Sequence, residues 1–157
     1  MFDVLEVMTY DIAKIISQWK YEGEYSIYSF QETEEVMNEL LNQDYFPCLN
    51  QEKEVIGYFC KGHSAIIPTL ENYDYDDGIL DIGLGMAPKL CNHGYGYDFM
   101  ACGFTFMKQK YGDVPMRLSV ACFNHRAIKL YLKHGFVKVK KVTHKNSHQP
   151  FWIMIRQ

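Results

Sequence analysis

The chain has 157 residues, 48% hydrophobic and 15% aromatic, which suits a single globular domain over residues 1–157 with a sizeable core. It contains no run of 18 apolar residues, and its first residues have neither the basic flank nor the apolar block of a secretory signal. These features argue against a membrane protein and predict a cytoplasmic one. The five cysteines are odd in number and form no C-x-x-C pair, so we expect buried thiols rather than a disulfide framework or a structural zinc site.

Charge is distributed unevenly along the chain, although the net charge is only -3. Residues 1–86 contain 17 acidic and 4 basic side chains, whereas residues 87–157 contain 2 acidic and 12 basic side chains. A polyanion would favour the second half and a cation the first. Mutual attraction of the two halves in the folded state would explain the same pattern, and both interpretations stay open.

In the first half, hydrophobic periodicity predicts two helices followed by a hairpin. Residues 2–8 alternate loosely as a strand, and Thr9 or Asp11 caps a helix that runs through Trp19. A second helix, near Gln31 to Asn42, places Val36, Leu40 and Leu41 inward. The hairpin consists of Tyr45 to Leu49, a turn, and Val55 to Lys61. The polar loop Glu71 to Gly78 then leads into a strand, Ile79 to Met86.

The second half predicts one long helix, one short helix and three strands. The long helix runs from about Gly94 to Gln109, with Tyr97, Met100, Ala101, Phe104 and Met107 repeating at helical intervals. Asn124 caps the short helix and Gly135 ends it. The strands are Met116 to Cys122, Phe136 to Thr143 and Phe151 to Ile155. The lysines from Lys138 to Lys141 are predicted to form the solvent-exposed face of a strand. This arrangement and the negative net charge argue against a nucleic-acid partner.

The stretch from Cys91 to Gly96, CNHGYG, lies in the turn between a strand and the long helix. A helix start offers unpaired N–H groups and the positive end of the helix dipole, and glycine at positions 94 and 96 allows a phosphate to approach closely. Neither the P-loop pattern nor the dinucleotide G-x-G-x-x-G is present. The turn is therefore a candidate phosphate site outside those two nucleotide-binding folds, unless it is a tight turn without a ligand.

A second motif, NHRAIKLYLKHGF from Asn124 to Phe136, follows the strand RLSVAC from Arg117 to Cys122. With DIGLGMAP from Asp81 to Pro88 and HGYG from His93 to Gly96, it resembles the GNAT superfamily of acetyl-CoA-dependent N-acetyltransferases. The resemblance is clear from about residue 79 to residue 139. It implies an α/β (α+β) fold with a mixed, mostly antiparallel seven-stranded sheet, flanked by helices and with strands splayed at the coenzyme A site.

The resemblance also implies positions for the cofactor. The segment from Cys91 to Gly96 matches the pyrophosphate loop of the family, in which Cys91 stands where Gln or Arg is usual. Main-chain groups at Leu84 and Met86 correspond to those that pair with the pantetheine arm. The cofactor residues that the resemblance implies are Leu84, Met86, Cys91, Asn92, His93, Gly94, Tyr95, Gly96, Asn124 and Tyr131.

Acetyl transfer requires a neutral amine, a stabilised oxyanion and a proton for the departing thiolate. Tyrosine, with an ordinary pKa of about 10, is protonated at neutral pH, so Tyr131, which matches a tyrosine near the thioester sulfur, suits the acid. Asp81 is the candidate base, acting through water, and the N–H of Met86 is the candidate oxyanion donor. The segments Glu22 to Tyr28 and Asn72 to Asp77 are expected to line an acceptor pocket that attracts a cation, unless they are only solvated.

The predicted function is direct transfer of an acetyl group from acetyl-CoA to a primary amine of a small molecule or peptide. The alternatives are a non-catalytic acyl-CoA-binding sensor or scaffold, and an enzyme that transfers a longer acyl chain. Peptide or ribosomal protein N-termini, polyamines, aminoglycosides and amino acids all remain possible acceptors. No metal site is expected, because His144 and His148 fall in a turn without a third ligand. A monomer and a homodimer are both compatible with the sequence.

Overall fold

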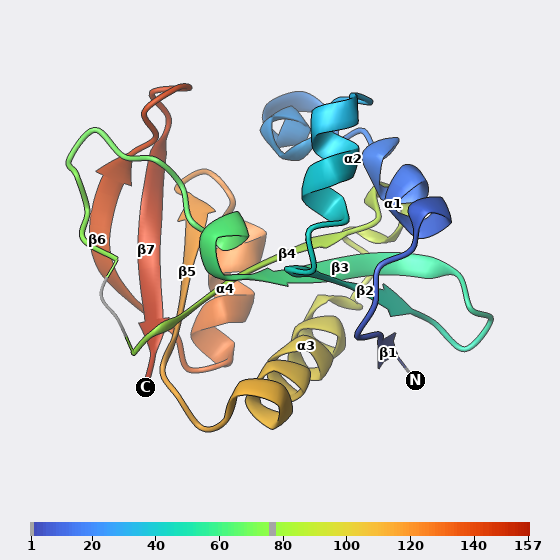
Figure 1. Cartoon of the computed structure of the whole chain (residues 1–157). Coiled ribbons are helices and arrows are strands. Elements are labelled where there is room, and N and C mark those ends of the chain that lie inside the picture. Colours follow the sequence, from blue (N-terminus) through green and yellow to red (C-terminus); the bar gives the residue numbers. More distant parts are fainter. Residues whose placement is uncertain (1, 76–77) are drawn as a thin grey trace. The chain divides into compact units, whose positions relative to one another are not determined.

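The computed structural model describes residues 2–75 and 78–157 (Figure 1). Asp76 and Asp77, the last residues of the expected acceptor loop, lie outside this range. The elements of the described part are β1 (Asp3–Val4), α1 (Tyr10–Ser17), the 3-10 helix η1 (Gly23–Tyr28), α2 (Glu34–Leu40), β2 (Tyr45–Leu49), β3 (Val55–Lys61), the 3-10 helix η2 (Gly62–Ala65), β4 (Leu80–Met86), the 3-10 helix η3 (Pro88–Leu90), α3 (Gly96–Tyr111), β5 (Met116–Ala121), α4 (His125–Lys133), β6 (Val137–Thr143) and β7 (Pro150–Arg156).

The strands form one seven-stranded sheet in the order β1-β2-β3-β4-β5-β7-β6. A parallel register pairs β4 with β5, through Leu80↔Met116 and Asp81↔Arg117. The hairpin of β2 and β3 has the predicted ends. The predicted fold class, a mixed and mostly antiparallel sheet flanked by helices, is confirmed.

The contacts within the chain divide it into two compact units that interleave along the sequence. Unit 1 comprises residues 1–60 and 84–106, and unit 2 comprises residues 61–83 and 107–157. The chain passes between the units three times, so neither is a continuous segment. The assignment of residues 1–157 to one domain stays a prediction.

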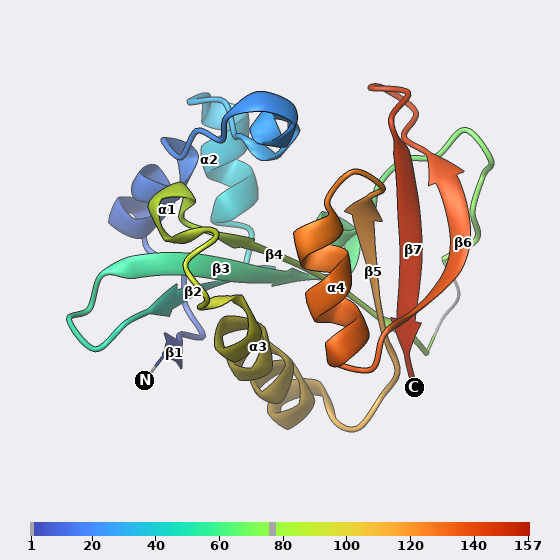
Figure 2. The same cartoon turned by 180° about the vertical axis from the view of Figure 1, so that it is seen from behind.

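In unit 1, α1 and α2 lie on one side of the strands and α3 lies on the other (Figures 1 and 2). Of the two predicted cap candidates, Thr9 and Asp11, it is Thr9 that caps α1: its hydroxyl accepts from the N–H of Ile12. On the α3 side, the rings of Phe59 and Phe99 stack with their centroids 4.6 Å apart. A Cβ on Gly103 would lie 2.0 Å from the Phe59 ring, so this glycine permits α3 to pack closely on β3.

Three predicted details of unit 1 are wrong. Leu41 is 37% exposed, because α2 ends at Leu40 and Leu41 has left the helix. Tyr97 is 46% exposed, although Met100, Phe104 and Met107 of the same predicted pattern are buried, and Phe99, which the pattern did not include, is fully buried as well. The first strand has two residues instead of seven. Its neighbour β2 contains Pro47, which has no N–H to donate to a longer partner.

In unit 2, β7 pairs with β5 and β6 in antiparallel register. Helix α4 lies on the side of these strands that is nearer in Figure 2, and residues 62–75 pass along the side that is nearer in Figure 1. The latter segment is bonded to the end of β6: Thr69 forms a bridge with His144, and the N–H of Leu70 donates to the carbonyl of Thr143 at 3.0 Å. Strand β6 is at the edge of the sheet, and Val137 and Val139 are exposed together with the predicted wet lysines.

All five cysteines are free thiols in the described structure. Cys48 and Cys60 are buried as expected, whereas Cys91, Cys102 and Cys122 are only partly buried. The prediction of buried thiols is therefore correct for two of the five positions.

Candidate functional site

The expected phosphate turn lies between η3 and α3 in unit 1. Residues 92–95 are exposed, and α3 begins at Gly96. Asn92 and Gly94 both have left-handed backbone angles, with φ of 63° and 85°. A Cβ on Gly94 would meet nothing within 4 Å, so glycine is required here for its backbone angle and not for space. The turn thus presents exposed main chain followed by the first N–H groups of a helix, which have no partner within the helix.

Cys91, at the usual Gln or Arg position of the family, is directed back toward the end of β4. Its Sγ lies 3.7 Å from the carbonyl oxygen of Met86 and 3.6 Å from that of Ala87, within reach of weak hydrogen bonds. The thiol therefore contributes to fixing the strand end. Phosphate contacts at this turn would come from main-chain N–H groups, which need no side-chain charge.

The end of β4 carries a contact that the sequence did not suggest. The hydroxyl of Tyr21 donates a hydrogen bond of 2.5 Å to the carbonyl of Met86, 65 residues away. Burial, and then the nearby Cys91, raise the pKa of Tyr21, so its hydroxyl keeps the proton that it donates. The Met86 carbonyl is thus engaged, while the N–H of Met86 is the predicted oxyanion donor.

An aromatic cluster lies beside the same strand end. The Tyr58 ring stacks on Trp19 with a centroid distance of 6.4 Å and tilts against Phe30 at 5.8 Å. A Cβ on Gly85 would lie 2.5 Å from the Tyr58 ring, so glycine at this position brings the ring onto the main chain of β4. The cluster of Trp19, Phe30 and Tyr58 gives this part of unit 1 an aromatic surface next to Gly85 and Met86.

Two predicted site residues lie on α4 or at its start, in unit 2. The side chain of Asn124 caps the helix by accepting from the N–H of Ala127 at 3.3 Å, which confirms the predicted cap. Tyr131 is 6% exposed, and its ring lies 6.0 Å from that of Phe136. The N–H of Phe136 donates to the Tyr131 carbonyl, so the helix end and the next strand fix the position of this tyrosine. Its role as the acid stays a prediction.

Asp81, the candidate base, forms a two-point ion pair with Arg117 in the adjacent strand. The Arg117 Nε and Nη2 donate to the two carboxylate oxygens at 2.6 and 2.9 Å. Arg117 is 1% exposed, so Asp81 supplies the countercharge that a buried guanidinium requires. Because both of its oxygens are engaged, this pairing counts against Asp81 as a base, and that role stays a prediction.

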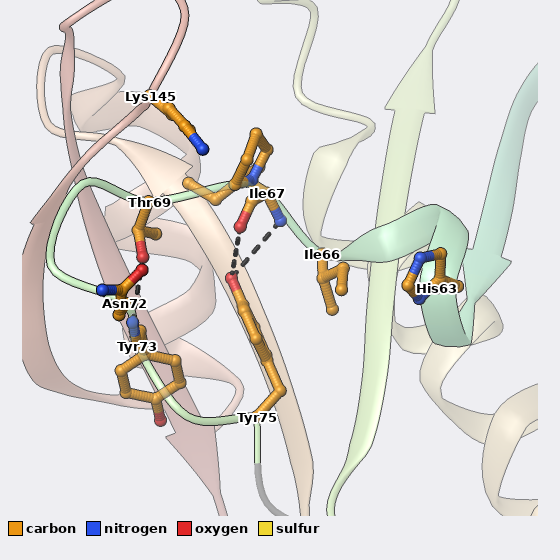
Figure 3. Close-up of a pocket in the computed structure, with 9 residues that line it drawn as sticks. His63, Ile66, Ile67, Thr69, Asn72, Tyr73, Tyr75 and Lys145 are labelled. Carbon is orange, nitrogen blue, oxygen red and sulfur yellow. Dashed lines mark hydrogen bonds between the residues drawn. The ribbon is translucent and has the colours of Figure 1, made fainter.

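The two segments that were expected to shape an acceptor pocket differ in structure. Residues 23–28 form η1, which buries none of its side chains. Asn72, Tyr73 and Tyr75 from the other segment line a pocket in unit 2, and Figure 3 draws the bonds from Tyr73 to Thr69 and between Tyr75 and Ile67. Their role in binding an acceptor stays a prediction.

Neither a metal cluster nor a membrane span occurs in the part of the chain that the structure describes. It contains no group of three or more His, Cys, Asp or Glu side chains that would hold a metal ion. His144 lies at the end of β6, where it packs on the Phe151 ring at 5.6 Å. No helix within residues 2–75 and 78–157 is long and apolar enough to cross a membrane.

Tyr21 and Arg117 were the residues that sequence reasoning missed. A tyrosine next to a run of acids, as in KYEGE at positions 20–24, carries no signal for a bond to a strand 65 residues away. Arg117 did carry one: it interrupts the apolar strand MRLSVA, and a buried arginine requires an acidic partner. Asp81, in the preceding strand, was the candidate for that partner.

Comparison with solved structures places the fold among acetyltransferases. A chimera of the spermidine N-acetyltransferase SpeG from Vibrio cholerae and hSSAT is 17% identical, with a TM-score of 0.72 over 99% of this chain and 94% of that one. A GNAT family acetyltransferase from Bacillus anthracis is 13% identical, with a TM-score of 0.72 over 98% and 93% of the two chains. AAC(6')-Ib in complex with ribostamycin and coenzyme A is 17% identical, with a TM-score of 0.74 over 99% and 93%.

No protein-family model and no curated protein sequence matches the chain. The identities to the solved structures are low, so the likeness concerns the fold, and it extends over nearly the whole length of both chains. The motifs around Gly94, Gly96 and Asn124 predicted this outcome. The chain has the fold of the GNAT acetyltransferases.

Proposed function

We propose that the protein is an N-acetyltransferase that moves an acetyl group from acetyl-CoA directly to a primary amine of a small molecule or peptide. The observation that carries the proposal is the exposed glycine turn at the start of α3, with Gly94 at a φ of 85°. It occurs in a fold whose solved examples include spermidine and aminoglycoside acetyltransferases, one of them bound to coenzyme A.

The cofactor would be held mainly by the main chain. In this proposal the N–H groups at Asn92 to Gly96 receive the pyrophosphate, aided by the positive end of the α3 dipole. Main-chain groups at Leu84 and Met86 pair with the pantetheine arm, and the Asn124 amide contributes a further bond. Cys91 takes part by holding the Met86 and Ala87 carbonyls, and not by contacting phosphate.

The reaction would form a C–N bond between the amine and the acetyl carbonyl carbon, and break the C–S bond of the thioester. The N–H of Met86 stabilises the oxyanion, and Tyr131 gives its proton to the departing sulfur. The proton of the amine leaves to water, because both oxygens of Asp81 are engaged by Arg117. No covalent acetyl-enzyme is required, since none of the cysteines is assigned a base.

The proposal leaves the identity of the acceptor amine undecided. The solved neighbours act on spermidine or bind ribostamycin, both rich in amines. The acidic first half of the chain and the aromatic cluster of Trp19, Phe30 and Tyr58 support a cationic amine here as well. The cytoplasmic location, the monomeric or dimeric state and the absence of a nucleic-acid partner stay predictions.

The first experiment is a calorimetric titration with acetyl-CoA of the wild type, Gly94→Asp and Gly112→Asp. Gly112 is the matched control, since its φ is 90°, it is exposed and no atom lies within 4 Å of its Cβ position. We expect micromolar binding by the wild type and by Gly112→Asp, and its loss in Gly94→Asp. No binding by the wild type would refute the proposed use of this turn.

Binding alone would not separate the enzyme from an acyl-CoA sensor or scaffold. Thiol release should therefore be measured with spermidine, ribostamycin and a peptide amine as acceptors. Thiol release that depends on the added amine supports the enzyme. Binding of acetyl-CoA without thiol release, whichever amine is added, supports the sensor or scaffold. Thermal stabilisation by acetyl-, butyryl- and octanoyl-CoA would show whether a longer acyl chain is preferred.

A further inference from the structure

Unit 2 contains a pocket of about 450 Å³ that no step of the proposed reaction uses. Its apolar wall is formed by Ile66, Ile67 and Pro68, with the rings of Tyr73 and Tyr75 beside them, and Lys145 stands at its border. Figure 3 shows the Lys145 side chain extending toward the segment that holds Ile67. Pockets of a few hundred Å³ are the usual size for small-molecule ligands.

The wall of this pocket is held in place by hydrogen bonds. The Tyr75 hydroxyl accepts from the N–H of Ile67 at 3.3 Å and donates to its carbonyl at 3.0 Å (Figure 3). Burial raises the pKa of Tyr75, so the hydroxyl keeps the proton for this second bond. The N–H of Lys145 donates to the Pro68 carbonyl at 2.9 Å, and Thr69 accepts from the N–H of Tyr73 at 3.0 Å. The lining is therefore formed before any ligand arrives.

The rings of Tyr73 and Tyr75 are also held by contact with Arg117. The guanidinium carbon of Arg117 lies 4.7 Å from the centroid of the Tyr75 ring and 5.6 Å from that of Tyr73. Arg117 is buried and is neutralised by Asp81, so it positions these rings without adding an unpaired charge. The Tyr73 and Tyr75 rings meet edge to face at 5.0 Å.

The charged side chains on the described lining are basic, whereas the loop Asn72 to Asp77 was expected to attract a cation. The two basic side chains on the described lining are Lys145 and His63. None of the described carboxylates lines the pocket. Of the described carboxylates nearby, Glu71 is bonded to Thr143 and Asp81 to Arg117, whereas the exposed Asp74 lies between Tyr73 and Tyr75 in the sequence and is not part of the lining. The lining, as far as it is formed by the described residues, therefore favours an anion over a cation.

We propose that this pocket binds a small molecule that carries a carboxylate and an apolar group. The carboxylate pairs with the Lys145 ammonium, and the apolar group lies against Ile66, Ile67 and the Tyr75 ring. The side-chain amide of Asn72 and the hydroxyl of Thr69, both on the lining, supply further donors. None of its lining residues is among those assigned to acetyl-CoA, so binding at this pocket can be tested without the cofactor.

Three probes of nearly equal shape test the charge preference: phenylacetate, its neutral analogue phenylacetamide, and the cation phenethylamine. Each is titrated into the full chain, labelled at isoleucine methyl groups, and the shifts of Ile66 and Ile67 are followed by NMR. We expect phenylacetate to bind in the millimolar range that is typical of fragments. It should bind about threefold to fivefold more tightly than phenylacetamide, the usual effect of one partly exposed ion pair.

Two variants test whether Lys145 causes the preference for phenylacetate over phenylacetamide. Lys145→Gln should bring phenylacetate to the affinity of phenylacetamide, whereas the control Lys133→Gln, on α4 and outside the lining, should leave the ratio unchanged. Lys145 is exposed and its main-chain bond to Pro68 survives the substitution, so both variants should fold. Equal or tighter binding of phenethylamine by the wild type, the absence of methyl shifts with all three probes, or an unchanged ratio in Lys145→Gln would each overturn the proposal.

Discussion

The hydroxyl of Tyr21 donates a 2.5 Å hydrogen bond to the main-chain carbonyl of Met86, and so joins the segment after α1 to the end of β4. The Cys91 thiol approaches the same carbonyl from the start of the glycine turn. The segment after α1 and the start of the glycine turn, which the proposal assigns to the cofactor, are therefore fixed on one peptide group. That group directly follows the predicted oxyanion donor, the N–H of Met86.

Replacement of Tyr21 by Phe should weaken both the fold and the reaction. Loss of one hydrogen bond to a partly buried carbonyl typically costs about 1 kcal/mol, so the free energy of unfolding in urea should fall by that amount. If the bond positions the oxyanion donor, kcat should fall about fivefold while the acetyl-CoA Kd changes little. The control is Tyr10→Phe, at an exposed tyrosine of α1. An unchanged kcat would show that Tyr21 serves stability alone.

Local signals in the sequence predicted the elements of this fold well. Asn124 was predicted as a helix cap and Thr9 as one of two candidates beside Asp11, and both Asn124 and Thr9 accept an N–H of the helix that they precede. The hairpin of β2 and β3 was also predicted at both ends, because turn residues and the alternation of apolar side chains depend only on near neighbours. The glycine motif and the motif from Asn124 onward then predicted the fold through their resemblance to a family.

Contacts between distant segments could not be predicted in this way. The pairing of Asp81 with Arg117 depends on the register of two parallel strands separated by a helix, and no local pattern determines that register. The bond from Tyr21 to Met86 likewise depends on how a loop packs on a strand. Tyr97 is exposed although its position fits the periodicity, because helical spacing places a side chain on one face of a helix but does not determine how far the core extends along that face. The functional hypotheses for Asp81 and the loop at residues 72–75 rested on such contacts.

The Asp81–Arg117 pair should be more important for stability than for catalysis. Asp81→Asn leaves a buried guanidinium without its countercharge, and we expect the free energy of unfolding to fall by about 3–5 kcal/mol. The double variant Asp81→Asn/Arg117→Met removes both charges and should recover part of that loss. Urea denaturation of the three proteins measures the difference. An Asp81→Asn protein of wild-type stability with a severe loss of kcat would instead restore Asp81 as the base.

Gly103→Ala should lower the free energy of unfolding, whereas replacement of glycine by alanine within a helix ordinarily raises it. Alanine normally stabilises a helix by about 1 kcal/mol relative to glycine. At this position the new methyl group would lie 2.0 Å from the Phe59 ring, so β3 and α3 must move apart. We expect a net destabilisation of about 1–3 kcal/mol by thermal or urea unfolding. Thr105→Ala, at an exposed position of the same helix, is the control, and a more stable Gly103→Ala would contradict the close packing.

The attachment of the loop at residues 68–71 to β6 should depend on pH. Hydrogen bonds from the Thr143 N–H and then the Thr143 hydroxyl hold the pKa of Glu71 below its ordinary value. A lowered pKa in the folded state stabilises the protein at pH values above the ordinary glutamate pKa, near ~4.3, and this stabilisation is lost as the pH falls through the lowered value. Glu71→Gln should therefore unfold at a lower temperature than the wild type at neutral pH. The difference should shrink in acid, whereas Glu52→Gln, at an exposed turn, should show no such trend.

Tyr131→Phe tests the chemistry most directly, because the substitution removes one oxygen from a side chain that is 6% exposed and leaves the ring packed on Phe136. If Tyr131 protonates the departing thiolate, kcat should fall by about 10²–10⁴, while acetyl-CoA binds with nearly unchanged affinity. A thiolate leaving group of low pKa needs less protonation, so an activated thioester should restore part of the rate. Tyr97→Phe, at an exposed tyrosine of α3, is the control. Wild-type kcat in Tyr131→Phe would remove this residue from the mechanism and leave water as the proton donor.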